Sequence, residues 1–334
     1  METGVATCEF GPSILEVERL RVAYHSHNGA SFDALAGVSF ALRRGEILGV
    51  LGESGSGKST LAAALLRLLP PNGRVAAGRV VLEGQELLEA NPKTLRQIRG
   101  ARISLLAQEP SLALHPTMRI VEQVEEVLRA HERLKRRARR QRAFQVLSKL
   151  FTSDVERIAQ SYPHQLSGGQ RQRAVIAQAT VCQPGVVIAD EPTASLDPTT
   201  QREILGLFRT LRDELGLSVI WITHNPALLI GFAERVLVLY AGRIVELGLT
   251  EEVLFSPRHP YTQALLRCLP TFESRTSKKN LQSIPGNAAN LAALPTGCVF
   301  EPRCSERMEE CRLREPDLLA VTGSHRVACF KCTG

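Results

Sequence analysis

Residues 52–59 read GESGSGKS and have the spacing G-x-x-x-x-G-K-[ST] of a phosphate-binding loop. The three glycines let the backbone curl tightly, so that successive N–H groups can point inward at phosphate oxygens. At the end of the loop, the Lys58 ammonium can reach the β- and γ-phosphates, and the Ser59 hydroxyl can ligate Mg²⁺. The segment therefore predicts a binding site for a nucleoside triphosphate.

Two carboxylates follow an apolar run in residues 186–192, which read VVIADEP. A carboxylate at the carboxyl end of a strand beside a phosphate loop can hold the Mg²⁺ shell, and Asp190 has that position. Glu191 comes directly after it and is placed to orient or deprotonate an attacking water. The pair predicts that the bound triphosphate is hydrolysed.

These groups need strands and helices to hold them. Residues 46–51 form a short apolar run typical of a buried strand, and residues 60–69 continue after the loop at helical spacing. Residues 186–189 also have the character of a buried strand. Because a phosphate loop requires a strand before it and a helix after it, this context supports the motif.

A second glycine-rich segment, LSGGQ at residues 166–170, also begins a predicted helix. Ser167 is a good N-cap residue, and the helical spacing continues through Ala179. Bare N–H groups at a glycine-rich helix start can bind an anion. One nucleotide does not need two such sites from one chain.

Together these segments resemble the ATP-binding cassette family. The resemblance covers residues 14–250 and implies an α/β P-loop NTPase fold, with a mixed sheet core, an antiparallel β portion near the N-terminus and a helical subdomain at about residues 90–165. The matching pieces in chain order are Tyr24 in LRVAY, GESGSGKS, Gln108 in LLAQEP, LSGGQ, VVIADEP, SLD at residues 195–197 and His224 in WITH.

In that family the LSGGQ signature of one cassette covers the γ-phosphate bound by another. The resemblance therefore implies a head-to-tail dimer with ATP between two cassettes, formed with a second copy or a paralogous subunit. Tyr24 would stack on adenine, and Asp197 would lie along the interface. His224 would reach the γ-phosphate, and Gln108 would sense Mg²⁺ and couple to the partner.

The candidate residues fall into three sets. The catalytic candidates are Glu191, His224 and Gln108, and the Mg²⁺ ligand candidates are Ser59, Gln108 and Asp190. The residues expected to contact nucleotide are Tyr24, Gly52, Glu53, Ser54, Gly55, Ser56, Gly57, Lys58, Ser59, Thr60 and Asp190, together with Ser167, Gly168, Gly169, Gln170 and Asp197. Asn225 and Ser195 depart from the usual family residues, Asp and Ala, but neither departure removes a catalytic group.

The bulk composition is that of an ordinary soluble protein, with 44% hydrophobic and 22% charged residues. We expect no cleavable secretion signal and no membrane helix, because no run approaches about 18 consecutive apolar residues. A transport role would then need two separate permease subunits, an extracytoplasmic substrate-binding protein and a place on the cytoplasmic face of the membrane. The charge of +7 is concentrated at residues 133–143, RLKRRARRQRA, for which a solvated surface is the default and anionic lipid the minority interpretation.

Residues 251–334 follow the cassette as a short extension that contains six of the eight cysteines, five of them after residue 297. RHPYT at residues 258–262 and PRC at residues 302–304 resemble the C-terminal region of dipeptide, oligopeptide and nickel importer ATPases. The segments QEPSL at residues 108–112 and YPHQL at residues 162–166 resemble the same subfamily. The resemblance predicts an ATP-hydrolysing importer subunit for peptides, with nickel or another small solute as the alternative.

The C-terminal cysteines are spaced C-x₅-C-x₆-C-x₁₇-C and could hold a metal. Four thiolates suit a [4Fe–4S] cluster, which some members of the resembling subfamily carry at matching positions, whereas tight zinc sites usually contain closer pairs. An iron–sulfur cluster, zinc and unligated thiols all remain open, and a metal would staple a tail too small to hold its own core. The candidate ligands are Cys298, Cys304, Cys311 and Cys329; Cys332 is spare, and Cys8, Cys182 and Cys268 are expected to be inert.

Two other classes of function compete with the importer motor. A nucleic-acid-associated ATPase is compatible with the basic charge, but that class typically has tandem cassettes or long insertions, and none appears in this sequence. A metal-sensing or structural protein with vestigial ATPase activity conflicts with the intact catalytic set. We therefore expect no nucleic-acid partner.

Overall fold

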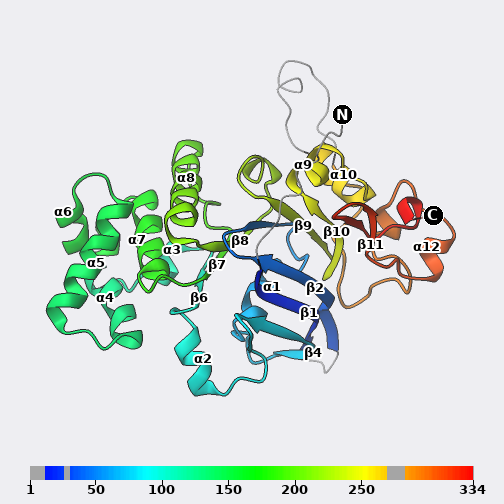
Figure 1. Ribbon diagram of the computed structural model, residues 1–334. Helices are drawn as coiled ribbons and strands as arrows, with labels where there is room; N and C mark the ends of the chain where they lie inside the picture. The colour runs from blue at the N-terminus through cyan, green and yellow to red at the C-terminus, as the bar shows by residue number, and fades with distance from the viewer. Residues whose placement is uncertain (1–11, 26–30, 269–282, 334) are drawn as a thin grey trace, which may run out of the picture.

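The computed structural model describes residues 12–25, 31–268 and 283–333 (Figure 1). The strands are β1 Ser13–His25, β2 Ser31–Arg43, β3 Ile47–Leu51, β4 Gly73–Leu82, β5 Gln85–Glu86, β6 Ile103–Leu106, β7 Val186–Asp190, β8 Ser218–Thr223, β9 Arg235–Tyr240, β10 Arg243–Leu249, β11 Leu319–Thr322 and β12 His325–Val327. The α-helices are α1 Lys58–Leu65, α2 Pro92–Ile98, α3 Pro110–Ala113, α4 Ile120–His131, α5 Arg136–Leu150, α6 Val155–Gln160, α7 Gly168–Thr180, α8 Pro198–Leu215, α9 Thr250–Phe255, α10 Pro260–Arg267, α12 Glu310–Leu313 and α13 Phe330–Thr333. Three 3₁₀ turns, η1 Pro163–Gln165, η2 Pro226–Leu228 and η3 Glu301–Arg303, complete the described elements.

The centre of the molecule is an eight-stranded sheet in the order β11-β12-β10-β9-β3-β8-β7-β6. The strands from β9 to β6 are parallel to one another, and β10, β12 and β11 add to them antiparallel. All five residues of β3 are buried, as expected for a parallel strand covered on both faces. The predicted mixed α/β sheet core is confirmed.

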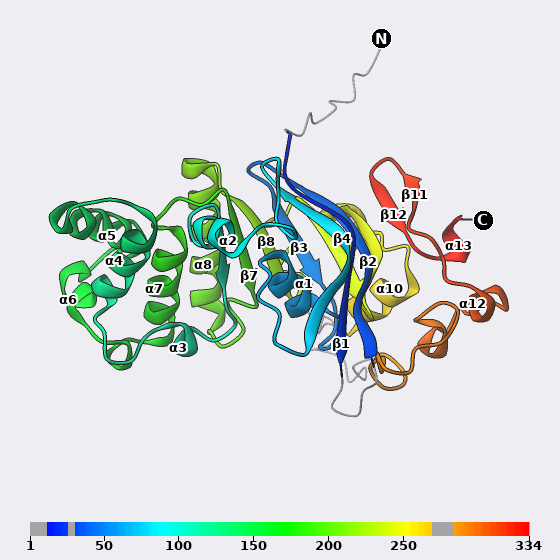
Figure 2. The same ribbon diagram turned by 90° about the horizontal axis from the view of Figure 1, so that it is seen from below.

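A second, four-stranded antiparallel sheet has the order β2-β1-β4-β5 and packs with α1 against one face of the central sheet (Figure 2). Val50, Ile188 and Leu61 belong to the hydrophobic core between them. Trp221 and Phe208 belong to a second core on the opposite face, where their rings meet edge to face with centroids 5.2 Å apart. The antiparallel β portion expected near the N-terminus is therefore present.

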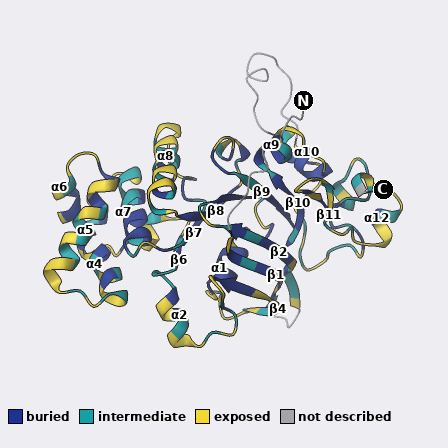
Figure 3. Cartoon of the chain, viewed as in Figure 1, coloured by how far each residue is buried: buried dark blue, intermediate teal, exposed yellow. Residues whose placement is uncertain are grey.

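Helices α3 to α7 lie at one end of the central sheet, and their outer faces carry much of the exposed surface (Figures 1 and 3). Within residues 90–165, β6 belongs to the central sheet, because it pairs in parallel with β7. The basic run covers the start of α5, where Arg140 pairs with Glu125 at 2.9 Å and Arg142 with Glu132 at 3.7 Å.

The C-terminal extension lies at the other end of the sheet and shares the core of the cassette (Figure 1). Tyr261 from α10 and Phe300 pack on Tyr240 of β9, with ring centroids 4.5 Å and 5.2 Å from that of Tyr240. The fully buried Glu246 of β10 accepts hydrogen bonds from backbone N–H groups of the extension and makes a 2.8 Å contact with His325 Nε2. Strand pairing and aromatic packing therefore hold the extension on the cassette, so it does not need a core of its own.

The helix predicted over residues 60–69 is shorter in the structure, because α1 ends at Leu65. Arg67 has a φ of 51°, in the left-handed region where a helix terminates, and Pro70 follows three residues later. The predicted strand over residues 46–51 begins one residue late, at Ile47. Glu46 instead pairs with Arg235 at 3.0 Å across the beginning of the sheet.

Candidate functional site

A cavity of about 940 Å³ opens where the phosphate loop, the carboxyl ends of the parallel strands and the extension meet. Its position beyond the carboxyl ends of β3, β7 and β8 is where open α/β sheets bind ligands. The residues lining it are Tyr24, Phe32, Ala34, Gly52, Glu53, Ser54, Gly55, Gly57, Lys58, Ser59, Thr60, Gln108, Glu191, His224, Leu265, Ala288 and Leu291.

The phosphate loop joins β3 to α1 and lies close to neighbouring backbone. A Cβ at Gly52 would lie 2.3 Å from the Leu239 carbonyl oxygen, so only glycine fits there without a backbone shift. Gly57 has a φ of 107°, and a Cβ there would lie 2.7 Å from the Ala34 carbonyl oxygen. The glycines therefore let the loop form against the neighbouring chain.

Lys58 is buried at the start of α1 and points back along the loop. Its ammonium donates hydrogen bonds to the carbonyl oxygens of Gly52 and Glu53, both at 2.8 Å. Burial lowers the pKa of Lys58, and the negative charges of Glu191, Asp190 and Glu53 oppose that shift. The ammonium is thus held in the cavity floor by carbonyl groups.

Asp190 ends β7 and supplies an oxygen that has no protein partner. Its Oδ1 atom is buried without a hydrogen-bond partner. Burial raises the pKa of Asp190, although a hydrogen bond from Ser59 lowers it in part. A carboxylate beside a hydroxyl is the oxygen donor set that Mg²⁺ takes, so these two residues fit that ion.

Glu191 brings together the three residues predicted to be catalytic. Its carboxylate accepts a 3.4 Å hydrogen bond from Gln108 Nε2 and lies 3.1 Å from His224 Nδ1. The Glu191 backbone has a φ of 48°, and its N–H donates to the Ile222 carbonyl at 3.0 Å. A non-glycine residue held in the left-handed region at this point marks a constrained turn. Asn225 accepts a 3.1 Å hydrogen bond from the Ala227 N–H and caps η2, so this family departure has a structural role.

Tyr24 comes from the end of β1 and lies at the mouth of the cavity. Its hydroxyl is 3.5 Å from Thr60 Oγ1, and its ring stacks with that of Phe32 at 6.0 Å between centroids. The antiparallel sheet therefore places the Tyr24 ring at the edge of the nucleotide cavity.

The LSGGQ segment lies elsewhere, and none of its residues lines this cavity. Ser167 caps α7, where its Oγ accepts the Gln170 N–H at 3.2 Å. A Cβ at Gly169 would lie 2.8 Å from Thr200 Cγ2, so α7 begins against the start of α8. Asp197 caps α8 by accepting the N–H groups of Thr199 and Thr200, both at 3.0 Å. The hydrogen bond from the Thr200 hydroxyl at 2.7 Å and then these backbone bonds lower the pKa of Asp197.

Sequence reasoning missed the part of the cavity wall that the extension provides. Leu265, Ala288 and Leu291 line the cavity beside Lys58, although they lie more than 200 positions further along the chain. Ala288 and Leu291 lie in none of the motifs, and RHPYT, which ends three residues before Leu265, gives no signal that this leucine faces the cavity.

Comparisons with known proteins assign the family. An ABC transporter model matches residues 35–194, and the model of the oligopeptide/dipeptide transporter C-terminal region matches residues 245–311. The probable D,D-dipeptide transport ATP-binding protein DdpD of Escherichia coli is 41% identical over 95% of this chain and 96% of its own length. This chain is an ABC transporter ATPase. The oligopeptide transport ATP-binding protein OppD of Salmonella typhimurium is 40% identical over 95% of this ABC transporter ATPase and 93% of its own length.

Solved structures agree with the fold of this ABC transporter ATPase. A dimeric bacterial ABC transporter cassette superposes with a TM-score of 0.63 and 29% identity, over 71% of this chain and 98% of its own. Another structure of the same coverage and score holds a cassette after hydrolysis, with ADP and phosphate. The predicted family, fold and ATPase class are confirmed.

The four predicted metal ligands of this ABC transporter ATPase, Cys298, Cys304, Cys311 and Cys329, line one small cavity in the extension. Within the residues that the structure describes, however, no group of three or more His, Cys, Asp or Glu side chains is placed to hold a metal ion, so the iron–sulfur prediction gains no support. Burial raises the pKa of Cys298 to about 11 and also raises that of Cys304 and Cys329. Cys182 and Cys268 are half-buried free thiols, and Cys8 lies outside the described residues.

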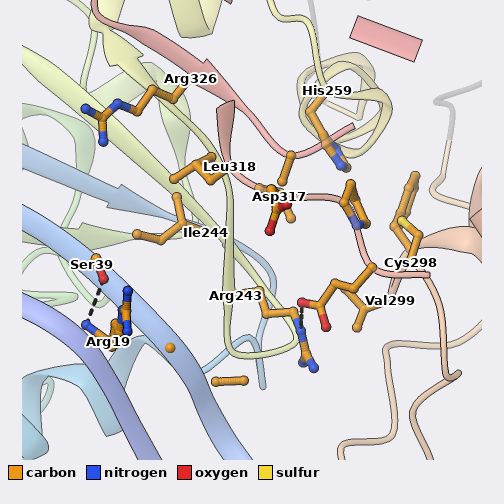
Figure 4. A pocket seen from close by; sticks show the side chains of 17 residues that line it. Arg19, Ser39, Arg243, Ile244, His259, Cys298, Val299, Asp317, Leu318 and Arg326 are labelled. Carbon is orange, nitrogen blue, oxygen red and sulfur yellow. Dashed lines mark hydrogen bonds and ion pairs between the residues drawn. The ribbon is translucent and has the colours of Figure 1, made fainter. Parts of the chain in front are cut away.

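A third cavity, of about 590 Å³, separates the extension from the antiparallel sheet (Figure 4). His259 and Cys298 lie on its extension side, and Arg243 reaches across to form an ion pair with Glu315. Arg19 lies on the opposite side, where its backbone N–H donates to Ser39 Oγ at 2.7 Å. Burial lowers the pKa of His259 to about 3, so its ring is neutral and fixed in the packing.

Proposed function

We propose that this ABC transporter ATPase is the ATP-hydrolysing subunit of a membrane importer for dipeptides or oligopeptides. The observation that carries the proposal is the match over nearly the whole chain to proteins named as peptide transport ATP-binding proteins. The match to the oligopeptide/dipeptide transporter C-terminal region supports the same substrate class. Import of nickel or another small solute is the alternative.

The proposed reaction places the ATP phosphates in the loop at the end of β3. The loop N–H groups and the Lys58 ammonium bind the β- and γ-phosphates, with adenine against Tyr24. Ser59 and Asp190 would hold Mg²⁺, which supplies charge neutralisation on the phosphate oxygens. Gln108 is a third candidate ligand for this ion.

Glu191 positions and deprotonates the attacking water in this proposal. Its contacts with Gln108 and His224 support the role, because they fix the carboxylate at the open side of the cavity. His224, whose side chain is 60% exposed, can turn toward the γ-phosphate.

The signature segment requires a partner cassette in this account. Ser167, Gly168 and Gly169 are remote from the cavity of their own chain, yet their helix start is exposed and fits an anion. We therefore propose a head-to-tail dimer, with each signature and the nearby Asp197 facing the nucleotide of the partner. A dimeric cassette among the similar structures supports the formation of a dimer.

Further subunits complete the proposed importer. No helix in the described parts of the chain is long and apolar enough to cross a bilayer. We propose two integral-membrane permease subunits and an extracytoplasmic substrate-binding protein as partners, with this subunit peripheral on the cytoplasmic face. No described feature favours a nucleic-acid partner.

Reconstitution tests the proposal. The chain, tagged and purified from membranes of cells co-expressing candidate permeases and a candidate second cassette, is expected to co-purify with two multi-span membrane proteins. In vesicles, the complex should import labelled dipeptide or oligopeptide at the expense of ATP. Uptake of nickel without uptake of peptide would favour the alternative solute, and ATPase stimulation by nucleic acid in place of permease association would contradict the proposal.

For the extension we propose a metal site formed by Cys298, Cys304, Cys311 and Cys329. Their position around one cavity supports it, although Cys298, Cys304 and Cys329 must first lose their protons and burial raises the pKa of these three thiols. Anaerobic purification followed by iron, sulfide and zinc assays distinguishes [4Fe–4S], Zn²⁺ and free thiols. Protein without metal above trace amounts would overturn the site.

A further inference from the structure

Glu53, the second residue of the phosphate loop, is held by two residues of the C-terminal extension. Arg303 donates two hydrogen bonds to its carboxylate, from Nη1 to Oε2 at 2.7 Å and from Nη2 to Oε1 at 3.1 Å. The hydroxyl of Tyr261 accepts the Glu53 backbone N–H at 2.9 Å. A carboxylate gripped by both arms of a guanidinium is fixed in direction as well as in place.

The two extension residues are themselves immobilised. Tyr261 is fully buried in α10, and the Arg303 side chain is only 7% exposed. Arg303 Nε also donates to the Pro285 carbonyl at 2.8 Å, and its guanidinium lies 5.8 Å from the centre of the Tyr240 ring. Burial alone would lower the pKa of Arg303, but hydrogen bonds and the charge of Glu53 outweigh it and raise that pKa. The contact is therefore a rigid and fully charged support.

Glu53 in turn contacts the part of the loop that is predicted to bind phosphate. Its carbonyl oxygen accepts hydrogen bonds from the Lys58 ammonium at 2.8 Å and from the Ser56 N–H at 3.2 Å. The backbone N–H, the carbonyl and the carboxylate of this one residue are thus all engaged. The Lys58 ammonium and the loop N–H groups take their positions from the same peptide.

The charge of Glu53 gives the contact a second effect. Its carboxylate lines a cavity that receives a triphosphate, and like charges at short range repel. Arg303 neutralises the carboxylate and holds it against the extension. An unpaired Glu53 carboxylate would therefore oppose nucleotide binding.

We propose that the extension is part of the nucleotide site, with Arg303 and Tyr261 as positioning residues that act through Glu53 on the phosphate loop. The inference goes beyond the proposed importer function, since it concerns how this chain forms its ATP site whatever the cargo is. Because Arg303 immediately precedes Cys304, which lines the cysteine cavity, the proposal also predicts that nucleotide binding and that cavity affect each other, and such a coupling must be reciprocal.

Equilibrium binding of a fluorescent ATP analogue to the full purified chain tests the proposal without hydrolysis or transport. Arg303→Gln should weaken binding about tenfold, as expected when a charged hydrogen-bonded partner is lost. Arg303→Lys, which keeps the charge but loses the forked geometry, should recover only part of the affinity. Arg307→Gln is the matched control in the same extension, because Arg307 is half-exposed and lies 3.9 Å from Glu301.

A double-mutant cycle separates positioning through Glu53 from a general structural effect. In the Glu53→Gln background, Arg303→Gln should cost less than about twofold in affinity, because the charge that it neutralises is gone. Tyr261→Phe removes only the hydroxyl that accepts the Glu53 N–H and should weaken binding about threefold in a folded protein, an independent measurement if Arg303→Gln does not fold.

The reciprocal coupling has its own readout. Saturating ATP analogue should slow the reaction of Cys304 with a thiol reagent in the wild type, and Arg303→Gln should abolish this protection. The proposal is overturned if Arg303→Gln binds the analogue like the wild type, or if it costs the same in both Glu53 backgrounds. Failure of peptide import would leave these measurements unaffected, so the two proposals fail independently.

Discussion

Helices α1 and α7 both begin at glycine-rich segments whose first backbone N–H groups have no partner within the helix, but the side chains around the two helix starts differ. The phosphate loop before α1 borders a cavity that is also lined by a buried lysine, two acids and two aromatic rings. The signature start of α7 is capped by its own Ser167 and lines no part of that cavity. Free N–H groups at a helix start are therefore not sufficient for a nucleotide site. The charged side chains around each start determine which one can bind nucleotide without a partner chain.

The largest expected effect is on hydrolysis at the phosphate-loop side. Glu191→Gln should lower the rate of ATP turnover by about 10²–10⁴-fold, because the positioned base is lost. Nucleotide affinity should change less than about twofold, measured with the fluorescent analogue. Glu214→Gln is the control, since Glu214 is an exposed partner of Lys149. Turnover by Glu191→Gln at the wild-type rate would remove Glu191 from the mechanism.

Removal of the buried Lys58 ammonium should show that ATP binds at the start of α1 and not at the start of α7. Lys58→Ala is expected to weaken ATP affinity about 10–100-fold, because a charged hydrogen-bond donor to the phosphates is removed. The matched Lys149→Ala substitution changes a lysine that is 57% exposed and should leave the affinity unchanged. If Lys58→Ala bound ATP normally, the phosphate loop would not be the principal site.

The carboxylates beside the two starts predict different responses to pH. Burial raises the pKa of Asp190, so on acidification it takes up a proton at a higher pH than an ordinary aspartate does. On acidification, Mg²⁺-dependent ATP affinity should therefore begin to fall at a higher pH than an ordinary aspartate would give, whereas binding measured in EDTA should lack this Mg²⁺-linked fall. Asp190→Asn should remove the Mg²⁺ dependence at every pH. Asp197, whose pKa is lowered, should add nothing to this profile.

The smallest effect is expected at the signature start. Ser167→Ala removes the helix cap, which costs about 1 kcal/mol of local stability, so the signature should be less well ordered and hydrolysis should slow by at most roughly fivefold, while a single chain binds ATP normally. Ser148→Ala, on the exposed side of α5, is the control. A loss of ATP affinity in isolated Ser167→Ala chains would place the signature in the site of its own chain and contradict the comparison.

Local motifs made the cassette predictable. Phosphate binding demands particular residue types at fixed short spacing, so residues 52–59, Asp190 and Glu191 could be singled out from the sequence alone. The same local logic placed Ser167 as an N-cap. It did not predict the early end of α1, because residues 66–69 keep an apolar pattern after the backbone has left the helix.

The role of the extension could not be predicted in this way. Arg303 and Glu53 are 250 positions apart, and an arginine before a cysteine carries no periodic or spacing signal for such a contact. The cysteine pattern drew attention to metal, whereas the tail is held by β12 on β10 and by the Tyr240, Tyr261 and Phe300 rings. Long-range contacts of this kind depend on the assembled sheet and are invisible in a single sequence.

The pairing of β12 with β10 has a practical consequence for anyone who shortens this protein. A version ending after α10 would leave the outer backbone N–H and C=O groups of β10 bare, a template on which strands of other molecules can add. It would also remove His325, the imidazole partner of the buried Glu246 carboxylate. We therefore expect such a fragment to self-associate more readily than the full chain.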